Sequence, residues 1–262
     1  MEGFGQMERP GDPEFMASLA RGLAVMRCVA EAQRPLTIAD VTRRTALSRA
    51  AVRRCLYTLT LLGYVGHDER GYAVRRKALV LGHPYLSLNA LAARAQPLLD
   101  ELRDRLGESC SLGLMEEDQL YYVARGEASR IMSVGLRVGS RLPLYPTSMG
   151  RVLLGGRLDQ EQEAYLARVT PEPLTPRTIT DRAQLLVLFR SAAREGYAIV
   201  DQELEMGLRS VAVPVMDRGV VVAALNVGTS AQRVPIGEIH ERILPALLDA
   251  AAKLSARQDQ PD

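Results

Sequence analysis

The sequence predicts an α+β protein with a small helical N-terminal domain, a connector helix and a larger C-terminal α/β domain. Its 262 residues are enough for two ordinary domains. Apolar residues recur at helical spacing between residues 18 and 62, whereas strand-like and helix-like runs alternate after residue 109. Charge divides in the same way: residues 15–80 hold twelve Lys and Arg against four Asp and Glu, and residues 81–262 hold 20 against 23. A basic domain joined to a mildly acidic one indicates an anion-binding module.

We place the boundaries where composition and periodicity change. Residues 1–14 are rich in Gly and Pro and are expected to be disordered. The N-terminal domain is expected over 15–77, the connector helix over 78–107 and the C-terminal domain over 90–258.

The N-terminal domain is expected to contain three helices and a hairpin. Helical spacing of apolar residues predicts the first helix over 18–32. A threonine and an aspartate at capping-box spacing begin a short helix over 37–45, and Ser48 caps a longer helix over 48–62. Two short β-like pieces around a polar turn predict a hairpin over 63–74.

The third helix carries arginines beside an apolar stripe, and no acidic residue occurs from Val41 to His67. Winding the helix at about 100° per residue puts Val52, Cys55, Leu56, Leu59 and Leu62 on one side and Ala50, Arg53, Arg54, Tyr57 and Leu61 on the other. A short capped helix, a tight turn and a second helix that exposes small and basic residues form a helix-turn-helix, with the hairpin as a wing.

In this arrangement the second helix enters the major groove of DNA. We expect Arg53 to contact a guanine edge, and Arg49, Arg54 and Ser48 to contact phosphates. An ordinary amphipathic helix with surface arginines is the alternative. The residues predicted to contact DNA are Thr37, Ser48, Arg49, Ala50, Arg53, Arg54, Tyr57 and Arg75.

In the connector, an apolar stripe from Leu88 to Leu102 is expected to be partly buried between subunits. Beyond it, strands are expected at 111–115, 119–125, 131–136, 197–201, 210–216 and 220–228, and helices at 148–155, 159–168, 181–195 and 237–256. Turn residues and single charges between the strands favour an antiparallel sheet with helices packed on it.

Composition argues against several classes of protein. A hydrophobic content of 47% with 24% charged residues is typical of a globular chain. The N-terminus lacks the features of a secretory signal, and the longest apolar runs fall short of the ~18 residues that span a bilayer. Cys28, Cys55 and Cys110 form no CxxC pattern and are expected to be reduced, with a redox sensor as the alternative. We therefore expect a cytoplasmic protein with no membrane partner, metal or cofactor.

Catalysis is not expected either. The histidines are His67, His83 and His240, none of them lies in a motif with Ser148 or Ser210, and there is no GxSxG. The three histidines and three cysteines have no metal-ligand spacing.

Six segments, taken together, resemble the IclR family of bacterial transcriptional regulators. They cover nearly the whole chain in the family's order: "FMASLARGLAVMRCVAE", "LTIADVTRRTALSRAAVRRCLYTLTLLGYV", "LGHPYL", "RLPLYPTSMGRVLL", "DQELEMGLRSVAVPV" and "VVAALNVG". "SRAAVRR" and "GLAVM" resemble most the branch that regulates the β-ketoadipate pathway, the PcaR, PcaU and PobR type. Pro146 departs from this pattern, since a small residue such as alanine is expected there. We expect this proline to reshape the mouth of the effector-binding pocket that the resemblance implies.

The resemblance implies that the C-terminal domain is a GAF-like effector-binding domain that closes a small cavity over its sheet. The residues that match the family's effector site are Thr147, Ser148, Met149, Gly150, Asp201, Glu203, Ser210, Asn226 and Gly228.

Physical chemistry supports part of this assignment. A helix that begins at Thr147 or Ser148 directs free N–H groups at a carboxylate. Ser210 and Asn226 lie among Val and Ala on strands, so an inward side chain needs a partner, and Arg137 is a possible carboxylate partner. Each of these residues could instead have a purely structural role. Thr147 would then only cap a helix, Asn226 would satisfy a turn, and Asp201 and Glu203 would hold a loop. The apolar wall is expected from Leu144, Met149 and Val211.

The function expected is a ligand-responsive regulator of genes for aromatic-acid catabolism. Candidate effectors are 4-hydroxybenzoate, protocatechuate and β-ketoadipate, and the family suggests homodimers, formed through the N-terminal domain, that pair into tetramers. An operator with two similar half-sites follows from a two-fold protein. The alternatives are an unrelated small organic acid as effector, a second domain that only oligomerises, and an enzyme with a basic appendage.

Overall fold

The computed structural model describes residues 12–32, 34–78, 90–128 and 136–256. The chain forms two compact units, Met1–Tyr85 and Leu86–Asp262. Several expected features lie outside the described residues, wholly or in part: the disorder over 1–14 as far as residue 11, the "LGHPYL" segment, the first part of the connector helix, most of the strand at 131–136, and residues 257–258.

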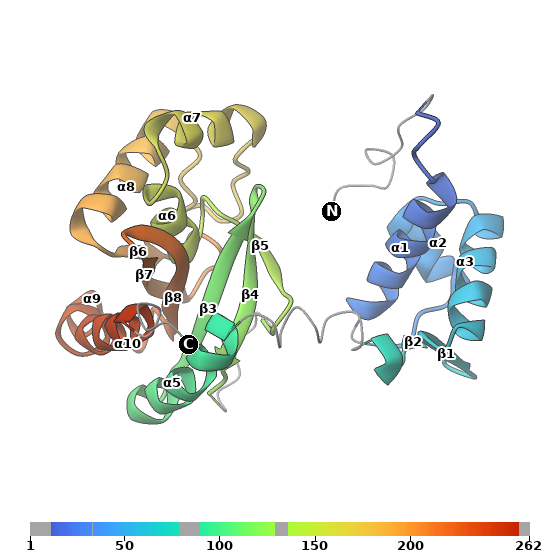
Figure 1. The fold of residues 1–262 in the computed structure, drawn as a ribbon, viewed down its shortest axis with the longest axis horizontal. Coiled ribbons are helices and arrows are strands. Elements are labelled where there is room, and N and C mark those ends of the chain that lie inside the picture. The colour runs from blue at the N-terminus through green and yellow to red at the C-terminus, as the bar shows by residue number, and fades with distance from the viewer. Residues whose placement is uncertain (1–11, 33, 79–89, 129–135, 257–262) are drawn as a thin grey trace. The chain divides into compact units, whose positions relative to one another are not determined.

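The N-terminal unit is a three-helix domain with a hairpin (Figure 1). Its elements are α1 (Ala17–Ala30), α2 (Ile38–Thr45), α3 (Arg49–Leu61), β1 (Val65–Asp68), β2 (Gly71–Val74) and a 3-10 turn, Arg76–Ala78. Val25, Val41, Val52 and Leu56 form the centre of its core. Both predicted caps are confirmed: Thr37 and Asp40 form a reciprocal capping box at α2, and the Ser48 side chain accepts a hydrogen bond from the Ala51 amide at α3.

The hairpin brings the chain close to the segment before α2. Leu36 and Tyr72 exchange backbone hydrogen bonds of 2.8 and 2.9 Å. Gly71 has a φ of +125°, and a Cβ there would lie 2.6 Å from the Leu36 carbonyl oxygen, so both conformation and space require glycine.

The C-terminal unit is built on one six-stranded sheet. Its strands are β3 (Ser109–Glu116), β4 (Gln119–Gly126), β5 (Arg141–Pro143), β6 (Ala198–Asp201), β7 (Leu208–Asp217) and β8 (Val220–Ser230). They are ordered β5-β4-β3-β8-β7-β6, and every neighbouring pair is antiparallel, as predicted. β5 was not among the expected strands.

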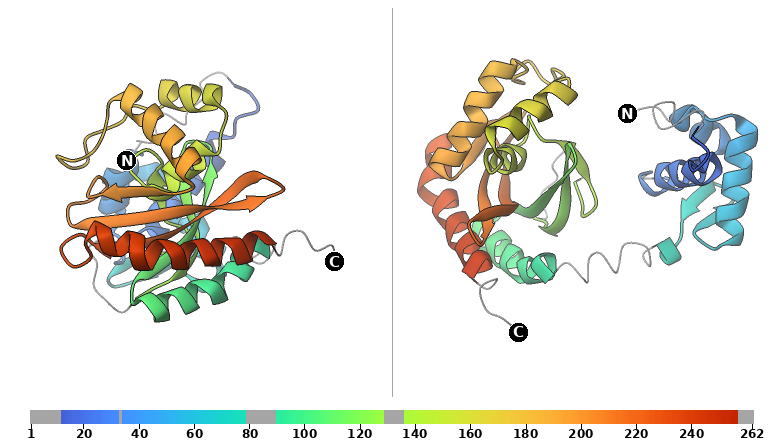
Figure 2. Two further views of the ribbon diagram at one scale, coloured as in Figure 1. Left: turned by 90° about the vertical axis from the view of Figure 1, so that its left-hand side faces the viewer. Right: turned by 45° about the horizontal axis from the view of Figure 1, so that its top comes forward.

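Helices cover both faces of this sheet (Figure 2). On one face, α5 (Ala90–Leu106) and α10 (Leu244–Ala256) enclose a core with Leu99, Leu225 and Leu247; α9 (Ile236–Glu238) and a π-helical turn, Ile239–Ile243, lead into α10. The other face is covered by α6 (Ser148–Gly155), α7 (Asp159–Arg168) and α8 (Arg182–Glu195). The α+β fold class predicted from the sequence is therefore confirmed.

Burial differs from the expectation at two places. Leu62 is 51% exposed although it was expected on the buried side of α3, because α3 ends at Leu61 and the chain turns away. Leu99 and Leu102 are buried against the sheet of their own domain, so that part of the leucine stripe is not available to a second subunit. Leu88 lies outside the described residues.

No helix in the described ranges is both long enough and apolar enough to cross a lipid bilayer.

Candidate functional sites

The exposed side of α3 is basic. Arg49, Arg53 and Arg54 are exposed, and no acidic side chain in the described part of the chain pairs with them. Ala50 and Tyr57 share this exposed side, with Tyr57 65% exposed. The predicted separation of α3 into a buried side and a basic side is confirmed apart from Leu62.

The remaining predicted DNA contacts differ in how free their side chains are. The Thr37 hydroxyl donates to Asp40 Oδ2 at 2.9 Å within the capping box, and the Ser48 hydroxyl oxygen caps α3, so both hydroxyls already serve their helices. Arg75 is exposed directly after β2. Arg44, at the end of α2, is exposed as well and was not predicted from the sequence.

A cavity of about 30 Å³ lies between the sheet and the N-terminal end of α6. This space holds only one or two water molecules, which is less than an aromatic acid occupies. Its described lining is Ser109, Tyr122, Arg125, Leu136, Pro146, Thr147, Ser148, Val200, Leu204, Leu208, Ser210, Asn226 and Gly228.

The strand register explains why polar side chains meet here. Arg125, Ser111 and Asn226 are directly opposite one another on β4, β3 and β8. Ser109 and Ser210 flank Gly228 in the row two residues along. Because residues two apart on a strand share a face, both polar rows lie on the face that α6 covers.

A β-bulge adds Tyr122 to this face. Tyr122 is opposite Gly113 and Ala124 is opposite Leu112, which leaves Val123 as an extra residue in β4. The extra residue lets Tyr122 and Arg125 line the same cavity although they are three positions apart.

The turn before α6 fixes the hydroxyls of the helix start. Thr147 is the N-cap of α6: its Oγ1 accepts from the Gly150 amide at 3.1 Å and donates to the Leu144 carbonyl at 2.9 Å. A Cβ on Gly150 would collide with that carbonyl, so the turn packs directly against the helix only because residue 150 is glycine. The Ser148 and Ser210 hydroxyls lie 2.9 Å apart and join α6 to β7.

Asn226 has an unused acceptor inside the cavity. The residue is 7% exposed, and its Oδ1 atom is buried with no hydrogen-bond partner among the described residues. Tyr122 lines the same cavity. Burial raises the pKa of Tyr122 to about 12, whereas the charge of Arg125 and the Asn226 side chain act in the opposite direction.

Arg125 places a positive charge at the cavity. Its Nη1 donates to Ser111 Oγ at 2.8 Å, while its Nε is buried without a partner in the part of the chain that the structure describes. None of the described residues lining the cavity is acidic. The electrostatic character of the site is therefore that of an anion-binding site.

Five of the predicted effector residues line this cavity, namely Thr147, Ser148, Ser210, Asn226 and Gly228. The structure places the other expected effector residues elsewhere. Leu144 and Met149 are buried in the core around α6, and the Arg137 side chain is exposed in the turn before β5. Asp201 lies between Arg177 and Arg209, with ion pairs of 2.6 and 2.8 Å.

The physical reasons for these differences are local. Burial acts to raise the pKa of Asp201, but the hydrogen bond and charge of Arg209, together with Gln202 and Arg177, hold it below its ordinary value. Its carboxylate is thus already occupied. Val211, expected on the apolar wall, packs in the core on the opposite face because it is adjacent to Ser210 on β7.

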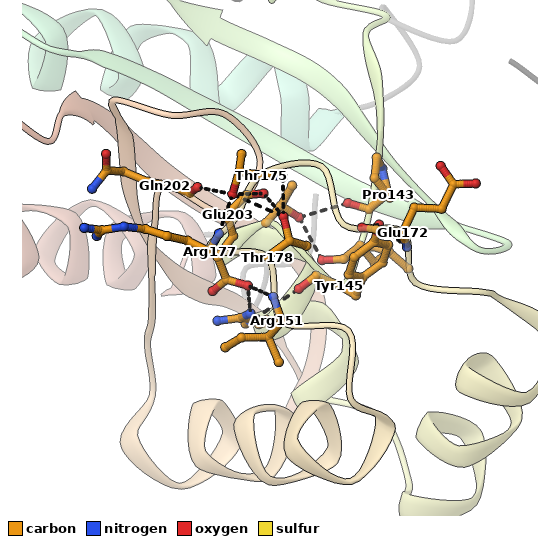
Figure 3. Close-up of polar contacts among 12 residues, drawn as sticks. Pro143, Tyr145, Arg151, Glu172, Thr175, Arg177, Thr178, Gln202 and Glu203 are labelled. Carbon is orange, nitrogen blue, oxygen red and sulfur yellow. Dashed lines mark hydrogen bonds and ion pairs between the residues drawn. The ribbon is translucent and has the colours of Figure 1, made fainter.

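Glu203 belongs to a buried ion pair that ties three segments together (Figure 3). Its carboxylate accepts from the Arg151 guanidinium at 2.6 Å and from the Ile179 amide at 3.0 Å. Arg151 also donates to the Tyr145 carbonyl at 3.1 Å, and Thr178 donates to the Glu203 carbonyl at 2.6 Å. Burial lowers the pKa of Arg151, opposed by the charge of Glu203. This pair joins α6, the loop before α8 and the connection from β6 to β7.

Inspection of the sequence missed Arg125, Tyr122 and Ser109 as cavity residues. The only signal for Arg125 is a charged residue near the end of the apolar run "QLYYVAR". Nothing in the sequence indicates the bulge that aligns it with Tyr122.

Comparison with known proteins bears on both units. The family model "Bacterial transcriptional regulator IclR C-terminal" matches residues 83–256, and "IclR helix-turn-helix domain" matches residues 18–69. The Pca regulon regulatory protein of Pseudomonas putida is 48% identical over 93% of this chain and 84% of its own length. The p-hydroxybenzoate hydroxylase transcriptional activator of Acinetobacter baylyi is 33% identical over 92% of this chain and 91% of its own length.

A solved structure resembles most of the chain. The crystal structure of an IclR homologue from Microbacterium hydrocarbonoxydans complexed with 4-hydroxybenzoate has a TM-score of 0.76 and 25% identity. The match covers 92% of this chain and 99% of that one.

Proposed function

Because the chain belongs to the IclR family of bacterial transcriptional regulators, we propose that it controls genes of aromatic-acid breakdown in response to a small carboxylate. The candidate effectors are 4-hydroxybenzoate, protocatechuate and the ring-cleavage product β-ketoadipate. The names of two relatives refer to the Pca regulon and to p-hydroxybenzoate hydroxylase, and one homologue was crystallised with 4-hydroxybenzoate. These relatives are regulators rather than enzymes.

In this proposal α3 binds operator DNA. Arg49, Arg53 and Arg54, which have no acidic partner among the residues that the structure describes, are matched to phosphates and guanine edges, which are the acceptors that DNA presents. Arg53 and Tyr57 are one turn apart on the exposed side, so both reach the same groove when α3 enters it.

The effector enters the cavity beneath the N-terminus of α6. The observation that carries this proposal is the convergence there of Ser148, Ser210, Asn226 and Arg125 in a site without lining carboxylates among the described residues. Since the cavity is only about 30 Å³, a ligand of benzoate size has to move α6 away from the sheet. A ligand that must move the wall of its own site favours a different conformation of the domain, as a ligand-responsive regulator requires.

The N-terminal unit presents a surface suited to self-association. An apolar groove of about 530 Å³ follows α1 and α3. Met16, Leu19, Leu23 and Leu62 line it and are 51–65% exposed. A second copy of the chain covers this groove in the proposed dimer, and pairs of dimers form the tetramer suggested by the family.

The proposed effector function is tested by a thermal-shift screen with aromatic acids and their ring-cleavage products, followed by calorimetry. A ligand that binds only the folded protein raises its stability in proportion to its occupancy. Ser210→Ala and Asn226→Ala should each weaken binding by about 1.5–3 kcal/mol, roughly ten- to hundredfold, because each removes a polar contact to the ligand.

Affinity for operator DNA without ligand should be unchanged in both variants. If neither substitution alters ligand affinity, the effector does not bind beneath α6.

A further inference from the structure

The two unused polar atoms of the cavity have opposite hydrogen-bonding character. Arg125 Nε is a cationic donor, and Asn226 Oδ1 is a neutral acceptor; both are buried without a partner in the described structure. A buried polar atom without a partner destabilises the protein, and the ligand that supplies the partner recovers that free energy on binding. The two atoms together therefore specify the chemistry of the ligand that complements them.

Arg125 calls for an anion. Ser111, which accepts a hydrogen bond from its guanidinium, is neutral, and no acidic side chain pairs with Arg125 among the described residues. Ser111 is itself 1% exposed and accepts from Nη1 at 2.8 Å, which anchors one end of the guanidinium. A carboxylate is the ligand group that matches a planar guanidinium by charge and geometry.

Asn226 calls for a hydrogen-bond donor. Its Oδ1 atom is buried without a hydrogen-bond partner among the described residues. An ionised carboxylate is an acceptor only and cannot satisfy Oδ1. A hydroxyl group on the ligand can donate to it.

We propose that Arg125 anchors the effector's carboxylate and that Asn226 Oδ1 accepts a hydrogen bond from an effector hydroxyl, so that the effector is a hydroxylated carboxylate rather than a plain carboxylate or a dicarboxylate. This inference rests on the proposed binding of a small carboxylate in the cavity, and it names the group that the ligand must carry besides its charge. Discrimination of this kind is strong when a site has a buried polar atom that the wrong ligand leaves unpaired.

The test is calorimetry of the full chain with four probes: 4-hydroxybenzoate, benzoate without the hydroxyl, 4-hydroxybenzamide without the charge, and adipate as a dicarboxylate. The wild type should bind 4-hydroxybenzoate about ten- to hundredfold more tightly than any of the other three. Arg125→Gln should reduce affinity for the acid while that for the amide is kept, so that the acid-to-amide preference falls close to one. Asn226→Ala should in the same way lose its preference for 4-hydroxybenzoate over benzoate.

Two further variants make the result specific. Arg137→Gln removes an exposed arginine that does not line the cavity and should retain every preference. Arg125→Lys keeps the charge without the fork of donors, and should retain a reduced preference for the acid; it replaces Arg125→Gln if that variant fails to fold.

Two results separate the possible failures. If the wild type prefers 4-hydroxybenzoate but Arg125→Gln and Asn226→Ala keep its preferences, or if benzoate or adipate binds as tightly as 4-hydroxybenzoate, then this inference is overturned while binding of a carboxylate stands. If none of the four probes binds, the proposed aromatic-acid function fails and the inference fails with it.

Discussion

Arg53 and Arg49 lie on the same helix of the N-terminal unit, yet we expect them to act on DNA in different ways. Arg53 is exposed about one turn into α3, and Arg49 is its first residue. Because the N-terminal turns of a recognition helix enter the major groove, we expect Arg53 to reach a base edge and Arg49, at the start of the helix, to contact a phosphate.

Substitution of each arginine by alanine separates the two roles. Arg53→Ala should weaken operator binding by about 1–3 kcal/mol and relax the preference at one base pair. Arg49→Ala should weaken binding to all sequences alike and reduce the slope of log affinity against log salt by roughly one unit. Fluorescence anisotropy titrations at several salt concentrations measure both effects.

Arg137→Ala is a suitable control, because this arginine is exposed in the C-terminal unit. Wild-type affinity in both α3 variants at moderate salt would show that α3 is not the recognition helix.

The residues of the cavity beneath α6 show how far sequence reasoning reaches. Thr147, Ser148, Ser210 and Asn226 were expected from the resemblance to the IclR family, with support from the need of polar side chains at a helix start and in Val-rich strands for partners, and all four line the cavity. Arg125 was missed because its role depends on pairing with Ser111 across two strands and on the bulge at Val123. Neither the strand register nor the bulge follows from alternation within one strand.

At the scale of elements, the helices and strands that could be predicted are those whose sequence signals lie within a few neighbouring residues. Thr37, Ser48 and Thr147 each precede a helix, and their hydroxyl oxygens cap its first turn. Each of these caps could be predicted from the sequence. β5 was not predicted because Arg141–Pro143 is three residues long and is held by pairing with β4, which is a non-local interaction.

The elements around the cavity are held by the Arg151–Glu203 pair, in which the side chains are only 3% and 6% exposed. Glu203→Gln leaves the buried Arg151 charge without its partner and should destabilise the domain by about 3–5 kcal/mol. The double substitution Arg151→Met with Glu203→Leu removes both charges and should destabilise it less. Urea-induced unfolding followed by circular dichroism measures the three proteins.

Asp118→Asn serves as the comparison, because it breaks an arginine–carboxylate pair with Arg168 that is open to solvent. This variant should unfold close to the wild-type midpoint. A Glu203→Gln midpoint as close to wild type as that of Asp118→Asn would mean that the buried pair does not hold these elements.

At the scale of the whole molecule, the two units differ in charge as they differ in expected role. The basic surplus falls in the unit whose α3 arginines, Arg49, Arg53 and Arg54, have no acidic partner among the described residues. The C-terminal unit pairs many of its arginines internally, as in Arg151–Glu203, Arg209–Asp201 and Arg233–Glu108. Net charge alone, at +2, conceals this asymmetry.

Self-association through the apolar surface of α1 is also a property of the whole molecule. Leu19 and Leu23 are 57% and 59% exposed on α1, and an apolar surface of this kind is covered when a protein dimerises. The double substitution Leu19→Asp with Leu23→Asp puts charges into the proposed interface and should shift the N-terminal units from paired to separate. Because two-fold proteins bind both halves of a pseudo-palindromic site at once, the loss of pairing should weaken operator binding more than tenfold.

Light scattering gives the mass of each protein, and anisotropy gives its affinity for an operator with one or two half-sites. Val187→Asp is the matched control, since Val187 is 63% exposed on α8 of the other unit. The wild type should bind two half-sites far more tightly than one, and the α1 variant should bind both operators with the weaker affinity. Ligand binding should be retained in that variant, because its cavity lies in the C-terminal unit. A wild-type protein that is monomeric at micromolar concentration, or an α1 variant with unchanged mass and unchanged preference for two half-sites, would show that this groove is not the dimer interface.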